Sequence, residues 1–200
     1  MFLEPDQVEA MIKDAGFEKT PEELIVMAKD FLASGFSIPS GGDMLAPSFE
    51  FAGPVVGPLS KSEFIRALNS FKIGESFTIS ERQYDFRVDP FEPNRVWFTT
   101  RPLVKHDKNG PLGPATGKIF EAPPQSCSIC FNKEGKVTQF TIGYVMDRRI
   151  GDTGGLGGIF GLLYAIDKGL PFPEAQPWEM SNQYKLFNFI QGFLSKLQGS

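Results

Sequence analysis

The sequence predicts an α+β domain in which helices cover one side of a curved antiparallel sheet. Three observations support this fold class: helical spacing of apolar residues in the first 71 positions, alternating apolar residues from residue 79 onward, and a last helical stripe near the C-terminus. Apolar residues three and four apart indicate a helix, whereas strict alternation indicates a strand with one buried face. Helices that are separated along the chain from a run of strands are typical of the α+β class.

The first 71 residues contain three helical patterns, two of them with clear start signals. The first pattern covers residues 5–15. The second begins after Thr20, whose side chain suits an N-cap and which forms a capping box with Glu23. The third repeats this arrangement with Ser60 and Glu63. We therefore expect two well-defined helix starts, at residues 21 and 61.

The strands are expected as one short strand followed by two hairpins. The short strand lies around residues 48–51. Residues 83–88 and 95–104 flank the turn sequence PFEPN and form the first hairpin. Residues 126–131 and 136–147 flank the turn sequence NKEG and form the second. Together these four strands predict an antiparallel meander.

Side-chain alternation predicts which face each strand residue occupies. The strand at 83–88 presents three side chains that we expect to pack under the helices: Tyr84, Phe86 and Val88. Trp97 and Arg101 share one face of the returning strand. If that face is concave, Trp97 forms a pocket wall and Arg101 anchors an anion; if it is the outer face, Arg101 meets solvent or a partner. His106 is expected in a solvated loop.

Composition and the two cysteines exclude several classes of function. The chain has 200 residues and 20 Phe, which suit either the inner face of a curved sheet or an apolar pocket. A net charge of −4 without a basic run argues against nucleic-acid binding, because phosphate contacts need clustered Lys and Arg. Cys127 and Cys130 have redox or zinc spacing, but strand residues three apart point to opposite faces. We expect two ordinary thiols, no metal and no cofactor.

The glycine-rich segment at 151–161, GDTGGLGGIFG, matches neither common phosphate-binding pattern. No Lys-Ser or Lys-Thr pair follows, as a P-loop requires, and no second strand follows to complete a dinucleotide-binding unit. We expect a turn that leads into a short apolar helix at 159–166, packed on the open end of the cone or on a neighbouring chain. Membrane contact by this helix is disfavoured, because on its N-terminal side basic residues flank it only at Arg148 and Arg149.

The chain is expected to divide into a domain at 1–150 and an extension at 151–200 that ends in a helix. That helix has one apolar stripe: Tyr184, Phe187, Ile190 and Leu194. No secretory signal begins the sequence, and the longest apolar run, 156–166, is too short to span a bilayer. We expect a cytoplasmic or plastid-stromal protein that is not secreted, with any transit peptide absent from this chain.

The region at 45–68, LAPSFEFAGPVVGPLSKSEFIRAL, resembles the NTF2-like cone fold, in particular its SnoaL-like and ketosteroid-isomerase-like group. The resemblance lies in a strand of pattern F-x-F-x-x-P, a Gly-Pro loop and a capped helix that begins SKxEF. The sequence KVTQFTIGYVMDR is similar to the long last strand of that group. The stretches DPFEPNRVWFTTRP, APPQS and GYVMDRRIGDTGGLGG resemble SnoaL-like proteins of phytoplankton. The resemblance covers residues 20–150 and implies a cone that often dimerises through its sheet.

The resemblance leaves the chemistry open, because this cone hosts several enzyme classes and proteins without a reaction. Gly53 occupies the place of the general base of ketosteroid isomerases, and His106, the only histidine, cannot supply a dehydratase pair or a histidine-rich metal cluster. The segment Arg87–Asp89 mimics only part of the network of limonene-epoxide-hydrolase-like sites. SnoaL-like cyclases resemble this chain in placing a catalytic Asp on a late strand, here at Asp147.

Two hypotheses of function follow. In the first, the protein is a cofactor-independent cyclase or isomerase type of enzyme on a small, mostly apolar substrate, with Asp147 as base and Tyr144 and Arg101 as polar partners. Burial would raise the pKa of Asp147 and a nearby Arg would lower it. Its ligand would contact five aromatic side chains: Trp97, Tyr84, Phe86, Phe140 and Phe160.

In the second hypothesis, the protein is a non-catalytic ligand-binding or assembly subunit. It would use the outer face of the sheet or the apolar segment to contact a partner protein, or the sheet to contact a second copy in a homodimer. The sequence DRR at 147–149 is then a surface ion-pair cluster that holds the following loop. Whether the chain is an enzyme stays open between the two hypotheses.

Overall fold

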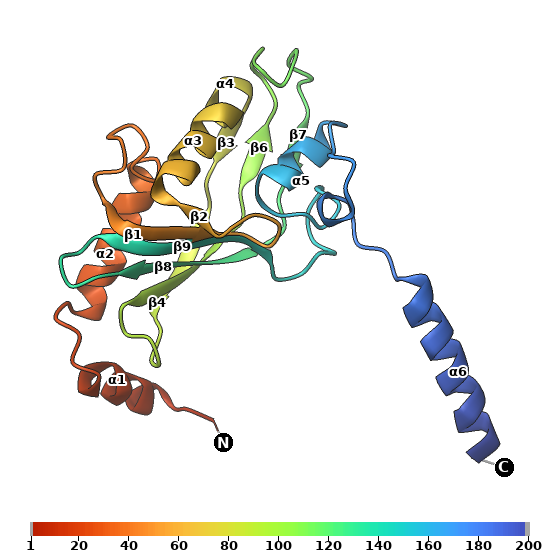
Figure 1. Ribbon diagram of the computed structural model, residues 1–200, viewed down its shortest axis with the longest axis horizontal. Helices are drawn as coiled ribbons and strands as arrows, with labels where there is room; N and C mark the ends of the chain where they lie inside the picture. The colour runs from red at the N-terminus through yellow and green to blue at the C-terminus, as the bar shows by residue number, and fades with distance from the viewer. Residues whose placement is uncertain (1, 199–200) are drawn as a thin grey trace.

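The computed structural model describes residues 2–198, with side chains described as far as residue 191 (Figure 1). The helices are α1 (Pro5–Asp14), α2 (Pro21–Ala33), α3 (Lys61–Phe71), α4 (Ile73–Ser76), α5 (Gly158–Ala165) and α6 (Asn182–Gln198). The strands are β1 (Leu45–Ala52), β2 (Leu59–Ser60), β3 (Thr78–Ser80), β4 (Gln83–Val88), β5 (Arg95–Thr100), β6 (Leu103–Lys105), β7 (Ile119–Glu121), β8 (Gln125–Phe131) and β9 (Val137–Val145). The α+β class expected from the sequence is confirmed.

Helices α2 and α3 begin at the residues that the capping signals indicate. The backbone N–H of Thr20 donates to the Glu23 carboxylate at 2.7 Å, and the Thr20 hydroxyl accepts from the Glu23 backbone N–H at 3.2 Å. The Ser60 backbone N–H donates to the Glu63 carboxylate at 2.9 Å. Each box satisfies backbone N–H groups that the first turn of a helix cannot pair internally.

The expected four-strand antiparallel meander is present as β4, β5, β8 and β9, within one of two sheets. The main sheet has the order β2-β1-β9-β8-β5-β4, and the small sheet has the order β3-β6-β7. The strand expected over 95–104 is divided between them, because β5 ends at Thr100 and Pro102 offers no backbone N–H to continue the ladder. Strand β1 pairs with β9 in parallel, with Phe51 opposite Phe140, so the main sheet is mixed.

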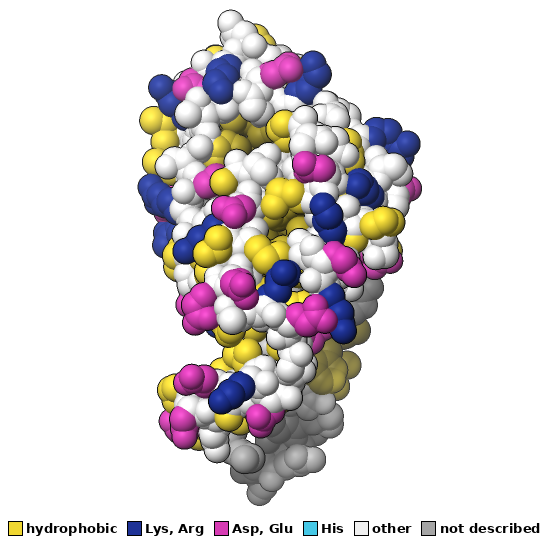
Figure 2. Space-filling view, turned by 90° about the vertical axis from the view of Figure 1, so that its left-hand side faces the viewer, with side chains coloured by type: hydrophobic (Ala, Val, Ile, Leu, Met, Phe, Trp, Pro, Cys, Tyr) yellow, Lys and Arg dark blue, Asp and Glu magenta, His cyan; other side chains and the backbone are white. Residues whose placement is uncertain are grey.

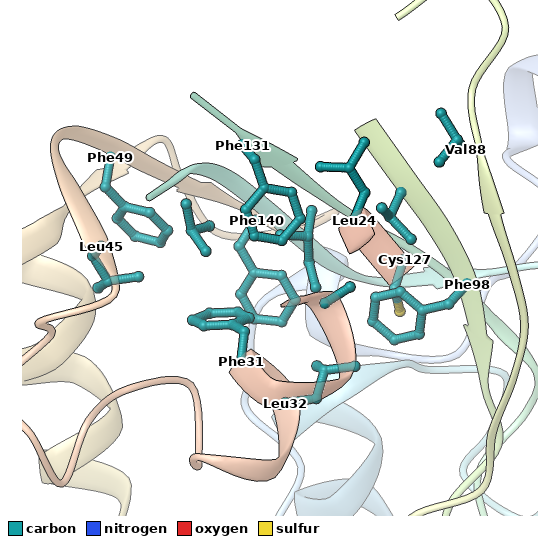
Figure 3. Packing of buried hydrophobic residues seen from close by; sticks show 14 of the residues in the cluster. Leu24, Phe31, Leu32, Leu45, Phe49, Val88, Phe98, Cys127, Phe131 and Phe140 are labelled. Carbon is teal, nitrogen blue, oxygen red and sulfur yellow. The ribbon is translucent and has the colours of Figure 1, made fainter. Parts of the chain in front are cut away.

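Helices α2 and α3 cover one face of the main sheet and enclose the larger core (Figure 1). Figure 3 shows Phe31 of α2 beside Phe140 of β9, with Phe131 and Leu24 on the far side of the Phe140 ring. The ring centroids of Phe31 and Phe140 lie 5.3 Å apart in an edge-to-face arrangement, which aromatic pairs prefer. The buried Phe residues of this core therefore pack on the inner face of the curved sheet. This was one of the two expectations for them, the other being an apolar pocket.

A second, smaller core lies between the small sheet and α5. Its buried members are Phe77, Val104, Phe120, Leu162 and Ile166. Helix α5 lies at one end of the main sheet, as expected for a cap on the cone, but its buried Leu162 belongs to this second core, as does Ile166 directly after the helix (Figure 1). The glycine-rich segment thus joins the main sheet to the second core.

His106 lies in the second core, so the expectation of a solvated loop residue is wrong. The side chain is fully buried, and its ring centroid lies 5.0 Å from that of Phe77. The Thr116 backbone N–H donates to His106 Nδ1 at 3.3 Å, and the Thr116 hydroxyl lies 3.0 Å from the same nitrogen. The loop after His106 turns back to form β7 beside β6, and this return covers the imidazole.

Candidate functional site

The space between α2, α3 and the main sheet, where a cone-fold pocket would lie, is occupied by phenylalanine side chains. Five of these are at most 2% exposed: Phe31, Phe49, Phe64, Phe131 and Phe140. Phe140 was expected to contact a ligand, but it contacts the rings of Phe31, Phe36 and Phe51 at 5.3, 5.3 and 5.8 Å. Its position is that of a core residue, which corrects the expected role as a pocket wall.

Two surface hollows of about 430 and 530 Å³ lie away from these rings. The first is lined by Asp152, Tyr164, Ala165, Asp167, Gly169 and Gln176, and the second by Asn109, Gly110, Gly113 and Pro114. Both are open to solvent and belong to α5 with its flanking loops and to the loop between β6 and β7. Neither hollow contains one of the aromatic side chains that the sequence proposed as ligand contacts.

Asp147 forms a surface ion pair instead of facing an apolar interior. Its two carboxylate oxygens accept from Arg149 Nε at 2.9 Å and Nη2 at 2.7 Å, and one also accepts from the Arg149 backbone N–H at 2.9 Å. These hydrogen bonds, followed by the charges of Arg149 and Arg148, lower the pKa of Asp147 to about 2. A carboxylate with so low a pKa is a weak proton acceptor, so this geometry opposes a role as general base.

An NMR titration of the carboxyl groups tests this assignment. The Asp147 carboxyl should titrate with a pKa of about 2. In the Arg149→Ala variant its pKa should rise toward the ordinary aspartate value of about 4, because the two side-chain hydrogen bonds are lost. An Asp147 pKa above that ordinary value in the wild-type protein would restore the acid-base hypothesis.

Arg101 and Tyr144, the expected partners of Asp147, do not join it. Arg101 follows the end of β5, and its Nη2 donates to the Glu121 carboxylate of β7 at 2.7 Å, so its charge is already paired. Tyr144 is 44% exposed on β9. Among the side chains that the structure describes, no hydrogen bond or ion pair connects Asp147, Tyr144 and Arg101.

Tyr84 faces away from the helices, which corrects the expected alternation of β4. Tyr84 lies opposite Thr99 and Arg87 lies opposite Trp97, so two residues of β4 face one residue of β5 between these pairs. The extra residue is Asp85, whose φ of 61° marks the bulge. Phe86 stacks on Phe98 at 5.2 Å inside the core, as expected, whereas Tyr84 is 48% exposed.

The face of the main sheet opposite the helices carries three of the expected site residues, Tyr84, Trp97 and Tyr144. We call it the outer face. It consists of Met146 and of residues that lie opposite one another in neighbouring strands, namely Tyr84, Arg87, Arg95, Trp97, Thr99, Ser126, Ser128, Cys130, Gln139, Thr141 and Tyr144. Met146 joins this set because the Thr99 hydroxyl lies 4.0 Å from its sulfur. Trp97 is therefore an outer-face residue and not a wall of the cone.

A network of hydrogen bonds fixes the polar part of the outer face. Arg95 donates to the Ser128 hydroxyl at 2.8 Å, to the Gln139 side-chain oxygen at 3.0 Å and to the Glu92 carboxylate at 2.6 Å. The Trp97 indole N–H donates to the Asp89 carboxylate at 2.7 Å. The Arg95 guanidinium also lies 5.5 Å from the Trp97 ring, within cation–π range. The hydrogen-bond donors and acceptors of these outer-face side chains are thus largely paired within one chain.

Glu81, between β3 and β4, is an acid–base candidate that the sequence did not reveal. Burial raises the pKa of its carboxyl group, although the Thr100 hydroxyl at 3.4 Å acts in the opposite direction. Glu81 as a whole residue is nevertheless exposed to solvent. Glu81 follows a three-residue strand without a clear alternating pattern, so no sequence signal pointed to it.

The raised pKa of Glu81 predicts a pH-dependent stability. Between the unfolded and the folded pKa, the folded chain binds more protons than the unfolded chain, so stability falls as the pH rises through this window. The Glu81→Gln variant should therefore melt at a higher temperature than wild type at neutral pH. Below the ordinary carboxyl pKa of about 4 the difference should vanish. Glu134→Gln, at an exposed turn position, is the matched control, and an equal gain there would contradict the assignment.

The two cysteines are ordinary strand thiols, as expected. Cys127 lies in the core and Cys130 on the outer face, so their side chains point in opposite directions. Burial raises the pKa of Cys127 to about 12 and that of Cys130 to about 11, so both stay protonated near neutral pH. In residues 2–191, no group of three His, Cys, Asp or Glu side chains is placed to hold a metal ion.

The glycines before α5 permit close packing against the end of the main sheet. A side chain at Gly157 would overlap the carbonyl oxygen of Gly143 and approach the Gln125 side-chain oxygen at 2.9 Å. The Gly158 backbone N–H donates to that same Gln125 oxygen at 3.0 Å. Phe160, proposed as a ligand contact, instead lies edge-on to Phe172 at 6.1 Å in the loop after α5.

Charged side chains of both signs are interspersed on the side of the molecule shown in Figure 2. No broad basic area is seen on that side.

No protein-family model matches the chain. No curated protein matches it either. Solved structures do match. AclR from Streptomyces galilaeus, whose assignment as a hydroxylase is provisional, is 10% identical with a TM-score of 0.51, and the match covers 90% of this chain and 97% of that one. A protein from Jannaschia sp. CCS1, provisionally a SnoaL-like polyketide cyclase, is 12% identical with a TM-score of 0.50 and coverage of 78% and 100%.

An LEH-like epoxide hydrolase from Mycobacterium tuberculosis is 13% identical with a TM-score of 0.48 and coverage of 80% and 100%. Identities this low establish the fold and not the chemistry. The fold expected from the sequence, an NTF2-like cone, is confirmed by the two structures with TM-scores of 0.51 and 0.50. The closer resemblance to phytoplankton proteins stays a prediction.

Proposed function

We propose that this NTF2-like chain is a non-catalytic assembly subunit that binds a second copy of itself through the outer face of its main sheet. One observation carries the proposal above all: phenylalanine side chains occupy the interior where relatives of this shape could hold a ligand. Because the inner face of the main sheet is covered, only its outer face is open to bind another molecule.

The outer face has the composition of a protein–protein interface. Tyr84 is 48% exposed, Tyr144 is 44% exposed and Met146 is 61% exposed, all on the same side of the sheet. Tyr, Trp, Met and Arg are enriched in interfaces, and Trp97 and Arg95 lie on β5, between the strands that carry Tyr84 and Tyr144. Two copies related by a two-fold axis would each present this patch to the other, as isologous dimers do.

The hydrogen bonds within this face reduce the cost of covering it. A donor or acceptor that loses water without gaining a partner destabilises a complex. Arg95 and Asp89 already have partners in Glu92, Ser128 and Trp97 within the same chain. A second copy could therefore cover these groups without leaving them unpaired.

Sedimentation velocity of three variants tests this proposal. Tyr84→Asp and Tyr144→Asp place a charge at the centre of the expected contact and should convert a dimer into a monomer. Ile119→Asp is the matched control, because Ile119 is an exposed apolar strand residue, 64% exposed, on the small sheet. The control should sediment as the wild-type dimer does. A wild-type protein that is monomeric at all concentrations would contradict the proposal.

A second candidate function keeps the small-molecule hypothesis, with a mostly apolar ligand and chemistry of the cyclase or isomerase type. The raised pKa of Glu81 favours it, because a carboxyl group of raised pKa suits proton transfer near neutral pH. Native mass spectrometry of the purified chain distinguishes the two. A retained small molecule of constant mass would support ligand binding, and the assembly proposal expects protein mass alone.

A further inference from the structure

The C-terminal helix α6 extends away from the body of the molecule on an elongated connector (Figure 1). Its described apolar side chains are open to solvent: Leu186 is 59% exposed, Phe187 54%, Phe189 74% and Ile190 45%. Such a concentration of large apolar groups on a free helix is unfavourable in water and marks an interaction surface. None of these α6 side chains belongs to the main core, to the second core or to the outer face.

The apolar side chains of α6 share one side of the helix. Residues three and four apart lie on the same side of a helix, which groups Leu186 with Phe189 and Ile190, and Phe187 with Ile190. The polar residues Lys185, Asn188 and Gln191 are themselves three apart and lie on the other side. The result is an amphipathic helix with a wide apolar face.

The charge of this segment is opposite to that of the rest of the chain. Residues 180–200 contain two Lys and no Asp or Glu, which leaves 18 basic and 24 acidic residues in residues 1–179. In the part of α6 whose side chains are described, the polar side otherwise carries the uncharged Asn188 and Gln191. Phe and Leu residues on the apolar side, and positive rather than negative charge in the segment, are features of helices that lie in a membrane interface.

We propose that α6 binds the surface of a lipid bilayer, lying flat with its apolar side inserted among the acyl chains. No helix within residues 2–198 is long and apolar enough to cross a membrane, so α6 would lie along the surface rather than span it. Its 17 residues give a rod of about 25 Å, all of which can contact the surface because the connector holds it clear of the body. With only two Lys available, apolar insertion supplies most of the binding.

Two features argue against a second copy as the occupant of this helix. Seventeen residues span fewer than the three to four heptads that a coiled coil needs, so pairing of two α6 helices would be weak. A helix groove on the body would need a long apolar lining, whereas the first surface hollow is lined by polar groups such as Asp152, Asp167 and Gln176. A bilayer satisfies the whole apolar side without a preformed groove.

Flotation of the full chain with vesicles tests the proposal. Large vesicles of phosphatidylcholine with a minority of phosphatidylserine should carry the wild-type protein, and small vesicles of the same lipids should carry more, because curvature exposes acyl chains. The double variant Phe189→Ser with Ile190→Ser should partition at least about tenfold more weakly, because two large apolar side chains no longer insert. Added salt should weaken binding only modestly.

Phe91→Ser is the matched control for the double variant. Phe91 and Phe189 are both 74% exposed, but Phe91 lies in the turn between β4 and β5. The control should float as wild type does, and all three proteins should show the same melting temperature because neither site belongs to a core. A wild-type chain that stays in the soluble fraction with both vesicle types would overturn the proposal. So would equal binding by the double variant, or self-association through α6 without vesicle binding.

Discussion

Replacing Phe140 by alanine should destabilise the folded chain by about 3–5 kcal/mol, the range for removal of a buried Phe ring from a packed core. Phe140 is 1% exposed and has ring contacts with Phe31, Phe36 and Phe64 at 5.3, 5.3 and 6.1 Å. The surrounding strands and helices hold these rings from both sides, so the space left by the lost ring cannot close. Equilibrium unfolding in urea measures the difference.

The size of that loss separates a filled cone from a ligand pocket. If Phe140 lined an open pocket, the substitution would enlarge existing space and remove fewer contacts, so a loss below about 1 kcal/mol would contradict the filled cone. Phe91→Ala is the control, because Phe91 is 74% exposed and should change stability by no more than about 0.5 kcal/mol.

Replacing Gly157 by alanine should cost about 1–3 kcal/mol, as insertion of a methyl group into a close contact typically does. The added methyl group would overlap the Gly143 carbonyl oxygen, which is backbone and cannot rotate away. Helix α5 would have to move from the end of the main sheet, which would also weaken the 3.0 Å hydrogen bond from Gly158 to Gln125. The melting temperature should fall accordingly.

Gly74→Ala provides the matched glycine control. A side chain at Gly74 would meet nothing within 4 Å, and this residue lies inside α4. Alanine is the better helix former, so this substitution should leave stability unchanged or raise it by up to about 1 kcal/mol. An equal loss at both glycines would show that backbone freedom, and not the contact with Gly143, decides the effect at Gly157.

The local elements of this fold could be predicted from the sequence because their signals are local. The Thr20 and Ser60 capping boxes identify the starts of α2 and α3 within a few residues. The two hairpins follow from alternation and turn residues between neighbouring strands. The parallel pairing of β1 with β9 joins residues almost ninety positions apart, as in Phe51 and Phe140, and no local pattern specifies it.

The sequence predictions for Tyr84, Arg101 and His106 are wrong because single residues or short segments change a strand's register or a side chain's partner. The bulge at Asp85 moves Tyr84 to the outer face, although a regular strand would keep it with Phe86. Pro102 ends β5 and lets Arg101 turn to Glu121 instead of continuing the face of Trp97. His106 becomes buried through a strand, β7, that has only three residues and no readable alternation.

The candidate site was readable only in part for the same reason. The ion pair of Asp147 with Arg149 joins residues two apart, and the sequence DRR already offered it as an alternative to catalysis. The filled interior depends on the side-chain positions of five Phe residues from α2, α3 and three strands, which composition alone does not define. Abundant Phe agrees equally with a pocket and with a core.

The solvent accessibility of the methionine methyl groups tests the assembly proposal most directly. Met146 is 61% exposed and Met180 is 37% exposed in a single chain, so a soluble paramagnetic agent should broaden the methyl NMR signal of Met146 more strongly if the chain stays alone. If two copies pair through the outer face, Met146 becomes covered and Met180, in the connector before α6, does not. We therefore predict that the Met146 signal is protected relative to Met180, whereas stronger broadening of Met146 would contradict the proposed assembly.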